Sequence, residues 1–470
     1  MKDHESQPAP PEHALAEYAL RLSADDIAPE ALRHVAHIIF DTIGVAIGAH
    51  VGGHQSGMIP EAHELAAAAG VGDASLWSGA GRLPADRAAL CNGTWAEVLD
   101  YQDVVVHPRN NGHAAVTIVP AAVAVAEREG ASGRALAAAV AAGLEVTIAI
   151  LKVVGRRHRS DGRGFRTSSI ASPVGAAVAC GKLIGLDRTQ LLNAMGLAGA
   201  CAPNGLMPSL APTGGAFGMD KDWVNGLAAQ LAVNSADLAK RGMTASDRVV
   251  TGAQGISASH SHGDAEPLVA PIRGAPNIEF VALKKFAACY GVHSAMEATM
   301  LLLKETGWTE DSVDRVVVRI KGDSAVTLSG RNITNHMAAR FSLPYSVASA
   351  LKRADAPSIR DFEEPSIFDA EVLSTMDRIE LQADPELTRF HKDTGGFPAI
   401  VELHCKGQMK DARIDYPVGS AQRPMSWEDL VAKFRELTEG RWDTETRLEI
   451  ETRGAELLDM DDVGALIRLL

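Results

Sequence analysis

Residues 132–154 read SGRALAAAVAAGLEVTIAILKVV, and Arg134, Glu145 and Lys152 are the only charged residues in this stretch. Apolar residues fall on nearly every side of a helix drawn through it. A helix that is apolar all the way round is typical of the interior of a large helical assembly. The stretch therefore predicts a buried helix in a mainly α fold.

Similar alanine-rich segments flank this helix on both sides. One follows Asp25-Asp26, begins with Pro29 in its first turn and extends through Ile43, which is a typical helix start. Aromatic residues make up only 5% of the chain, which favours closely packed helices over a large β-sandwich. Further helices are expected at 84–99, 115–129, 168–184, 188–201 and 221–241.

The pattern changes after about residue 275. The runs 316–320 (VVVRI), 379–382 (IELQ) and 400–404 (IVELH) predict strands, with helices expected at 287–306 and 340–352. Segment 426–437 (SWEDLVAKFREL) begins with a Ser and an Asp spaced as in a capping box, which predicts a final helix.

These segments predict two domains in a chain of 470 residues, which is long enough to bury a sizeable core. Residues 13–272 and 421–470 are expected to form a large all-helical domain. Residues 273–420 are expected to form a smaller, inserted α+β lid domain. Residues 1–12 are polar and rich in proline, and we expect them to be a disordered lead-in.

Charge and composition exclude several classes of protein. Lys and Arg number 45 against 59 Asp and Glu, for a net charge of −14, which argues against nucleic acid or an anionic membrane as partner. Any anionic substrate must therefore be held by local cations. The chain contains no uninterrupted apolar run of about twenty residues, so we expect no membrane span.

The five cysteines are scattered and include no CxxC pair, which is typical of reduced thiols in a cytoplasm rather than of a zinc ribbon or a disulfide scaffold. The N-terminal segment lacks the apolar core of a signal peptide. We expect a cytoplasmic protein. The absence of HExxH and GxSxG motifs gives no support to a metalloprotease, an α/β-hydrolase or a metal site.

One polar cluster runs from Asn92 through Asp100 and Asp103 to His107 and His113, beside very apolar helices. It can be a helix end followed by a solvated loop. It can also be a site in which His113 is an acid or base and Asp100 orients or charges its ring.

Three further clusters also have two interpretations each. The segments 156–159 (RRHR) and 163–167 (RGFRT) can clamp a carboxylate or form a basic surface loop. The glycine-rich segment 214–218 before Lys221 can cradle an anion, although it is neither GxGxxG nor a Walker motif. Cys289 and His293 share one face if helical, and they line a site or are core residues.

In order and spacing, these segments resemble the MmgE/PrpD family over nearly the whole chain. The matching segments are Phe40-Asp41-Thr42-Ile43-Gly44-Val45, Asn92-Gly93 to Leu99-Asp100, His113, Leu183-Ile184-Gly185-Leu186-Asp187, Lys221, Lys284 to Cys289 and His293, Phe341-Ser342-Leu343-Pro344-Tyr345, and Pro424-Met425-Ser426.

The resemblance implies a homodimeric enzyme without an organic cofactor or a required metal, whose site lies between a helical and an α+β domain. It implies Asp100, His113, Lys221 and His293 as the catalytic residues. Substrate binding is expected from Arg166, Tyr345, Cys289 and Arg109.

Three positions depart from the family pattern. Gly164-Phe165-Arg166 stands where the family commonly has GFH, so a permanent cation replaces a titratable histidine. Val224 stands where the family often has a histidine, and Gln102 replaces a carboxylate. The fold and the reaction class therefore carry over better than the substrate does.

The expected reaction is proton abstraction beside a carboxylate of a small, 2-methylcitrate-like polycarboxylic acid, with dehydration as the leading outcome. Epimerisation, isomerisation and decarboxylation of a related acid are alternatives, because each can follow from the same carbanion. Such chemistry needs a positioned base and fixed cations. We expect His113 as the leading acid–base group and His293 as the second, with Lys221 and Arg166 holding carboxylates.

Two rival hypotheses belong to other classes of protein. A non-catalytic small-acid binder would keep the cations but need no pair of histidines, and it would show ligand-dependent stabilisation without turnover. A purely structural helical protein would need neither the cations nor the histidines.

Overall fold

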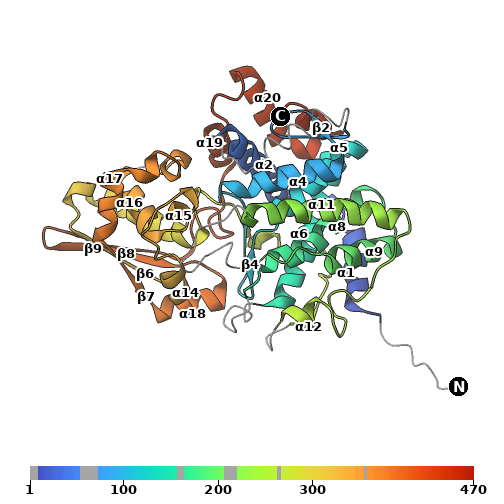
Figure 1. Ribbon diagram of the computed structural model, residues 1–470, viewed down its shortest axis with the longest axis horizontal. Coiled ribbons are helices and arrows are strands. Elements are labelled where there is room, and N and C mark those ends of the chain that lie inside the picture. Colours follow the sequence, from blue (N-terminus) through green and yellow to red (C-terminus); the bar gives the residue numbers. More distant parts are fainter. Residues whose placement is uncertain (1–8, 53–71, 156–163, 206–219, 262–265, 354–356) are drawn as a thin grey trace.

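The computed structural model describes residues 9–52, 72–155, 164–205, 220–261, 266–353 and 357–470. It confirms the mainly α fold, and most predicted helices lie within one or two residues of their expected bounds. Figure 1 shows a larger, helical part and a smaller part that contains β6–β9. The helices of the larger part are α1 (Pro11–Arg21), α2 (Pro29–Val51), α4 (Ala85–Val98), α5 (Ala115–Glu129), α6 (Gly133–Val154), α8 (Thr167–Leu183), α9 (Arg188–Ala200), α11 (Asp220–Lys240), α12 (Ile256–His260), α19 (Trp427–Leu437), α20 (Thr444–Ala455) and α21 (Gly464–Ile467).

Helix α6 packs inside the larger part and contacts α8, α5 and α2 (Figure 1). By length and composition alone, α2 and α6 are each long and apolar enough to cross a membrane. In the fold, however, 78% and 94% of their most apolar windows are buried. Both are accordingly core helices of the bundle, as the all-round apolar pattern of residues 132–154 predicts.

The folded body begins earlier than the expected lead-in of residues 1–12 allows. Helix α1 starts at Pro11, and Glu12 is buried. Its carboxylate accepts hydrogen bonds from the backbone N–H groups of Val250 and Thr251, at 3.0 and 2.7 Å. Pro11 and Glu12 therefore belong to the folded helix.

The smaller part is built on a four-stranded sheet in the order β7-β6-β8-β9 (Figure 1). Strands β6 and β7 are parallel, while β8 is antiparallel to both β6 and β9. Its elements are β6 (Arg315–Ile320), β7 (Ile379–Ala383), β8 (Ala399–Cys405), β9 (Gln408–Ile414), α13 (His293–Thr306), α14 (Gly322–Thr327), α15 (His336–Arg340), α16 (Leu343–Arg353), α17 (Ala370–Thr375) and α18 (Pro385–Thr394).

The helix expected at 287–306 is shorter than predicted. A single 3₁₀ turn, Tyr290–Val292, precedes α13, and α13 begins only at His293. Cys289 and His293 are therefore not on one face of a continuous helix. Strand β9 was not predicted, because its sequence QMKDARI is polar and largely exposed, as suits an edge strand.

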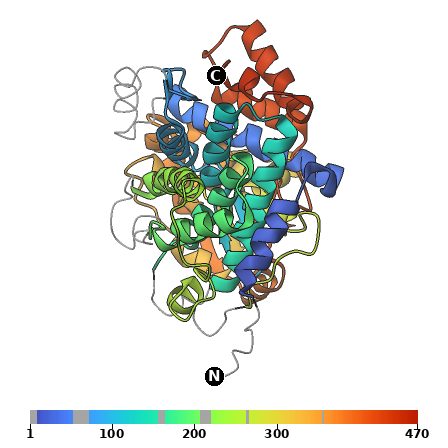
Figure 2. The same cartoon turned by 90° about the vertical axis from the view of Figure 1, so that its right-hand side faces the viewer.

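The C-terminal helices lie against α2 in both views (Figures 1 and 2). Ser426 and Asp429 form the predicted capping box at the start of α19. The rings of Phe40 in α2 and Phe434 in α19 have centroids 4.9 Å apart. The last helices of the chain thus complete the larger part.

A small three-stranded sheet, β4-β3-β5, joins two distant segments of the chain. Strand β3 (Val104–Val106) pairs with β4 (Asn111–Gly112) on one side and with β5 (Val281–Ala282) on the other. The sheet therefore places the loop after α4 beside the segment that leads to His293.

Candidate active site

Helix α4 ends in two buried carboxylates, Glu97 and Asp100, neither more than 1% exposed. Asp100 follows the last turn with φ of 49°, a left-handed conformation that Asp tolerates better than most residues but that still has a cost. Lys284 holds it there, because its Nζ donates to the Asp100 carbonyl at 2.7 Å and to Oδ2 at 3.1 Å.

Helix α11 brings Lys221 to the same place because it packs almost backbone to backbone on α4. A Cβ at Gly226 would lie 2.2 Å from Thr94 Oγ1 and 2.3 Å from the Leu90 carbonyl oxygen, so only glycine permits this approach. The Nζ of Lys221 lies 2.9 Å from Glu97 Oε1. Carboxylate oxygens of Asp222 and Asp100 lie 3.2 and 3.5 Å, respectively, from the same Nζ.

Arg166 precedes the first turn of α8 and is 4% exposed. Its Nη2 donates to Glu97 Oε1 at 2.7 Å, and its Nη1 donates to the Lys221 carbonyl at 2.9 Å. Both terminal nitrogens of Arg166, which was expected to bind the substrate, are therefore already hydrogen-bonded within the protein. The other arginines of the basic segment, at 156–163, and the glycines at 214–218 lie outside the described residues.

These ion pairs keep the carboxylates charged although they are buried. Burial alone would raise the pKa of Glu97, but Arg166 and Lys221 lower it to about 2. Burial likewise opposes ionisation of Asp100, yet Lys284 and Lys221 hold its pKa below its ordinary value. Burial would lower the pKa of Lys221, but Glu97, with Asp222 and Asp100, raises it above its ordinary value.

His113 stands at the end of β4, just before α5, and its ring is held by Asp103. The Nδ1 atom lies 2.5 Å from the Asp103 carbonyl oxygen, which can only accept, so Nδ1 carries the proton and Nε2 carries a lone pair. The Asp103 carboxylate accepts the backbone N–H groups of Ala114 and Val116, which fixes this turn. The expectation that Asp100 orients the ring is therefore wrong, because Asp103 does so.

His293 is the first residue of α13 and is completely buried. Its Nε2 donates to the Ala288 carbonyl at 3.2 Å, while Nδ1 is buried without a hydrogen-bond partner among the described residues. Burial lowers the pKa of His113 to about 4 and that of His293 to about 3. Both rings are therefore neutral at pH 7, and each has a nitrogen lone pair.

The structure brings the four predicted catalytic residues into one electrostatic cluster. The charges of Lys284 and Asp100 act on both histidines, and Lys221 pairs with Asp100. Cys289 borders this cluster, and burial and the charge of Asp100 raise the pKa of its thiol.

Two of the predicted substrate-binding residues lie elsewhere. Tyr345 is a core residue of the smaller part, 1% exposed, and its hydroxyl donates to the Asp361 carbonyl at 2.5 Å. Arg109 is half-buried in a loop and forms an ion pair with Glu266 at 2.9 Å. The structure brings neither side chain to the cluster.

Sequence reasoning missed three buried charges at or beside the cluster: Glu97, Lys284 and Arg340. Glu97 and Lys284 lie within the quoted family segments, and Arg340 immediately precedes one of them. A charged residue inside an otherwise apolar segment was the available signal, because such residues are almost never fully buried unless paired.

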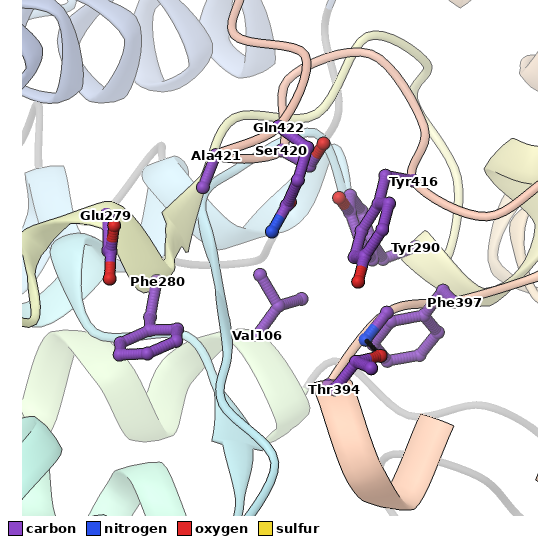
Figure 3. A pocket seen from close by; sticks show the side chains of 12 residues that line it. Val106, Glu279, Phe280, Tyr290, Thr394, Phe397, Tyr416, Ser420, Ala421 and Gln422 are labelled. Atoms are coloured by element: carbon purple, nitrogen blue, oxygen red, sulfur yellow. Dashed lines mark hydrogen bonds between the residues drawn. The ribbon is translucent and has the colours of Figure 1, made fainter. Parts of the chain in front are cut away.

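A separate hollow lies beside His293, between the two parts (Figure 3). It measures about 320 Å³, including the solvent at its mouth, and aromatic rings of Phe280, Tyr290, Phe397 and Tyr416 line it. The Tyr290 ring lies 5.2 Å from that of His293, centroid to centroid. No Lys, Arg or His is among its described lining residues, so its chemistry does not suit an anion.

Within the described ranges, no three or more His, Cys, Asp and Glu side chains are grouped closely enough to hold a metal ion. What the cluster provides is a pair of neutral imidazoles, paired ammonium and guanidinium groups, and buried carboxylates. Such an arrangement can transfer protons at carbon and stabilise the negative charge that develops.

Comparison with known proteins agrees with this chemistry. The MmgE/PrpD N-terminal domain matches residues 13–268, and the MmgE/PrpD C-terminal domain matches residues 286–457. The chain therefore belongs to the MmgE/PrpD family.

Curated relatives include two cis-aconitate decarboxylases. The Homo sapiens protein is 27% identical over 407 residues, which cover 83% of this chain and 80% of the relative. The Mus musculus protein is 24% identical over 413 residues, which cover 83% of this chain and 79% of the relative. This chain is an enzyme of the lyase or decarboxylase type.

Proposed function

We propose that this enzyme is a lyase that moves a proton to or from a carbon beside a carboxylate of a small polycarboxylic acid. The observation that carries the proposal is the pair of neutral histidines, His113 and His293, around the Lys284–Asp100 ion pair. A neutral imidazole with a lone pair is a suitable base at pH 7.

Decarboxylation of cis-aconitate is the first reaction to test, because the curated relatives carry that name. In such a reaction the bond to one carboxyl carbon breaks, carbon dioxide leaves, and the electron pair stays on the carbon chain. A proton must then be delivered to carbon. We assign that delivery to His113: Asp103 fixes the proton on Nδ1, so Nε2 first takes up a proton from the solvent and then passes it to the carbon.

The dehydration expected from the sequence uses the same groups, but here the proton is removed from carbon and not delivered to it. A base removes a proton from the carbon next to a carboxylate, the electron pair forms the double bond, and the hydroxyl group leaves as water after taking up a proton. A 2-methylcitrate-like acid therefore belongs in the same substrate panel.

The test follows a panel of acids by proton NMR in heavy water. The panel contains cis-aconitate, trans-aconitate, citrate, isocitrate, 2-methylcitrate and iminodisuccinate. We expect loss of carbon dioxide or uptake of deuterium at carbon with at least one acid, and loss of that reaction in His113→Asn. If no acid reacts and none binds, the proposal is wrong; binding without exchange or turnover would make the protein a small-acid binder.

The cellular location and the oligomeric state are also proposals. All five cysteines are free, which is consistent with a reducing cytoplasm. A homodimer rests on the family resemblance, and light scattering coupled to size-exclusion chromatography tests it. A monomeric mass would contradict it.

A further inference from the structure

The cations that were expected to hold the substrate are already paired within the protein. Arg166 and Lys221 share Glu97, Lys221 also faces Asp222 and Asp100, and Lys284 is bonded to Asp100. Three cations thus face three carboxylates, and burial raises the pKa of Asp222 only to about 6, so it is largely ionised at pH 7. A polycarboxylate needs a further cation.

Arg340 is a further buried cation beside these pairs. It ends α15, is completely buried, and donates from Nη1 to the Val98 carbonyl at 3.1 Å, at the end of the helix that leads into Asp100. Its own carbonyl accepts the backbone N–H of Cys289 at 3.0 Å. Arg340 therefore bridges the two segments that carry Asp100 and His293.

One edge of its guanidinium makes no hydrogen bond to the described residues. Both Nε and Nη2 are buried and have no hydrogen-bond partner among the described residues. The nearest carboxylate is that of the half-buried Glu363, whose Oε1 forms an ion pair with Nη2 at 3.6 Å without reaching hydrogen-bond distance. Buried donors are nearly always satisfied, so an open pair of donors calls for a partner.

The chemistry of this edge defines the partner. The Nε–H and one Nη2–H point in the same direction in the guanidinium plane and match the two oxygens of a carboxylate. Burial lowers the pKa of Arg340 despite the nearby charges of Glu363, Asp100 and Asp222. This direction agrees with a buried cation that its protein neighbours compensate incompletely.

We propose that Arg340 binds a carboxylate of the substrate through its Nε–Nη2 edge. This proposal rests on the proposed function, because it concerns the substrate of the same site. Arg166, whose terminal nitrogens are both bonded within the protein, then has a positioning role: it holds Glu97 and the start of α11.

The test compares Arg340→Lys with a matched control, Arg378→Lys. Lysine keeps the charge but lacks the two-donor edge. Arg378 lies in the same part of the molecule, and its terminal nitrogens are all bonded to protein groups, at 2.7–3.0 Å. A third variant, Glu363→Gln, tests whether Glu363 is the true partner of Arg340.

Binding is measured by thermal shift titration with malonate and with cis-aconitate, and turnover is measured separately. We expect Arg340→Lys to weaken the binding of both acids roughly ten- to hundred-fold, because a charge-assisted, two-point contact is lost. Arg378→Lys is expected to bind as the wild type does. Glu363→Gln is expected to bind equally or more tightly.

The outcomes separate this proposal from the proposed function. Wild-type affinity in Arg340→Lys, or a loss of binding in Glu363→Gln as large as in Arg340→Lys, overturns the role of Arg340. Binding that depends on Arg340 without turnover of any acid supports the role of Arg340 and refutes the proposed reaction. If the wild type binds neither of these two acids nor any other acid of the panel, both proposals are wrong.

Discussion

Replacing Glu97 by glutamine preserves the shape of the side chain but removes one negative charge from the buried network. Glu97 Oε1 receives Arg166 Nη2 at 2.7 Å and Lys221 Nζ at 2.9 Å. In Glu97→Gln both cations stay buried with weaker partners. Breaking a buried ion pair by removing one partner typically costs roughly 3–5 kcal/mol.

The pKa of Glu97 gives a second route to the magnitude. A shift from 4.5 to about 2 corresponds to about 3 kcal/mol, at about 1.4 kcal/mol per pH unit. Because the folded pKa is the lower one, this contribution is complete above about pH 4.5 and is lost as the pH falls through about 2. Unfolding of a helical part of roughly 300 residues has an entropy near 2.1 cal/mol/K per residue, so the midpoint falls by about 5 °C.

Thermal unfolding followed by circular dichroism checks this prediction at pH 7 and at decreasing pH. The difference between wild type and Glu97→Gln should narrow as the pH approaches the acid limit of stability. Equal midpoints at pH 7 would refute the reasoning, and so would a gap that does not change with pH.

Glu145→Gln is the matched control for this experiment. Glu145 is also a buried helical glutamate, but burial raises its pKa to about 7, and Asn277 is its hydrogen-bond partner at 2.6 Å. Its stabilising contribution is therefore present at low pH and lost as the pH rises through about 7. The gap between wild type and Glu145→Gln should narrow as the pH rises from about 4.5 to about 7, opposite in direction to that of Glu97→Gln.

Three further predictions follow from the site and its surroundings. His113→Asn can still donate to the Asp103 carbonyl but has no base, so kcat should fall at least about 100-fold with little change in melting temperature; unchanged turnover would remove His113 from the mechanism. With a pKa of about 4 for His113, a reaction in which His113 is the base should keep kcat/KM level from pH 8 to about 5 and lose it below that, whereas a decrease centred near pH 6.5 would contradict the lowered pKa. Tyr345→Phe should leave KM and kcat unchanged and cost about 1 kcal/mol of stability, from the lost hydrogen bond to Asp361; a tenfold rise in KM would return Tyr345 to the site.

The sequence was sufficient for most of the helices because their signals are local. The apolar pattern of residues 132–154 and the Ser426–Asp429 capping box each depend on residues close together in the chain, and both are present in the structure. Strand β9 could not be found in this way, because it forms through pairing with β8 and not through its own apolar residues.

The sequence identified the catalytic residues of the candidate site but not the ion pairs and hydrogen bonds between its side chains. Asp100, His113, Lys221 and His293 were identified, but the sequence could not show that Arg166 bonds to Glu97, 69 residues earlier in the chain. Asp103 was quoted only as part of a polar cluster, since its role depends on a backbone carbonyl, which no side-chain motif reveals. Tyr345 was placed in the site because of a family segment whose tyrosine in fact packs inside the smaller part.

The small sheet β4-β3-β5 has a mechanical consequence. His113 follows β4 directly, Lys284 follows β5 by two residues, and β3 is hydrogen-bonded to both strands. The segments that carry His113 and Lys284 are thus both held by hydrogen bonds to the central strand β3. Because both segments are hydrogen-bonded to β3, the spacing between His113 and Lys284 depends on the small sheet and not on the position of the four-stranded sheet. Insertions in the loops of the four-stranded sheet should therefore reduce activity less than a single residue added between β5 and Lys284.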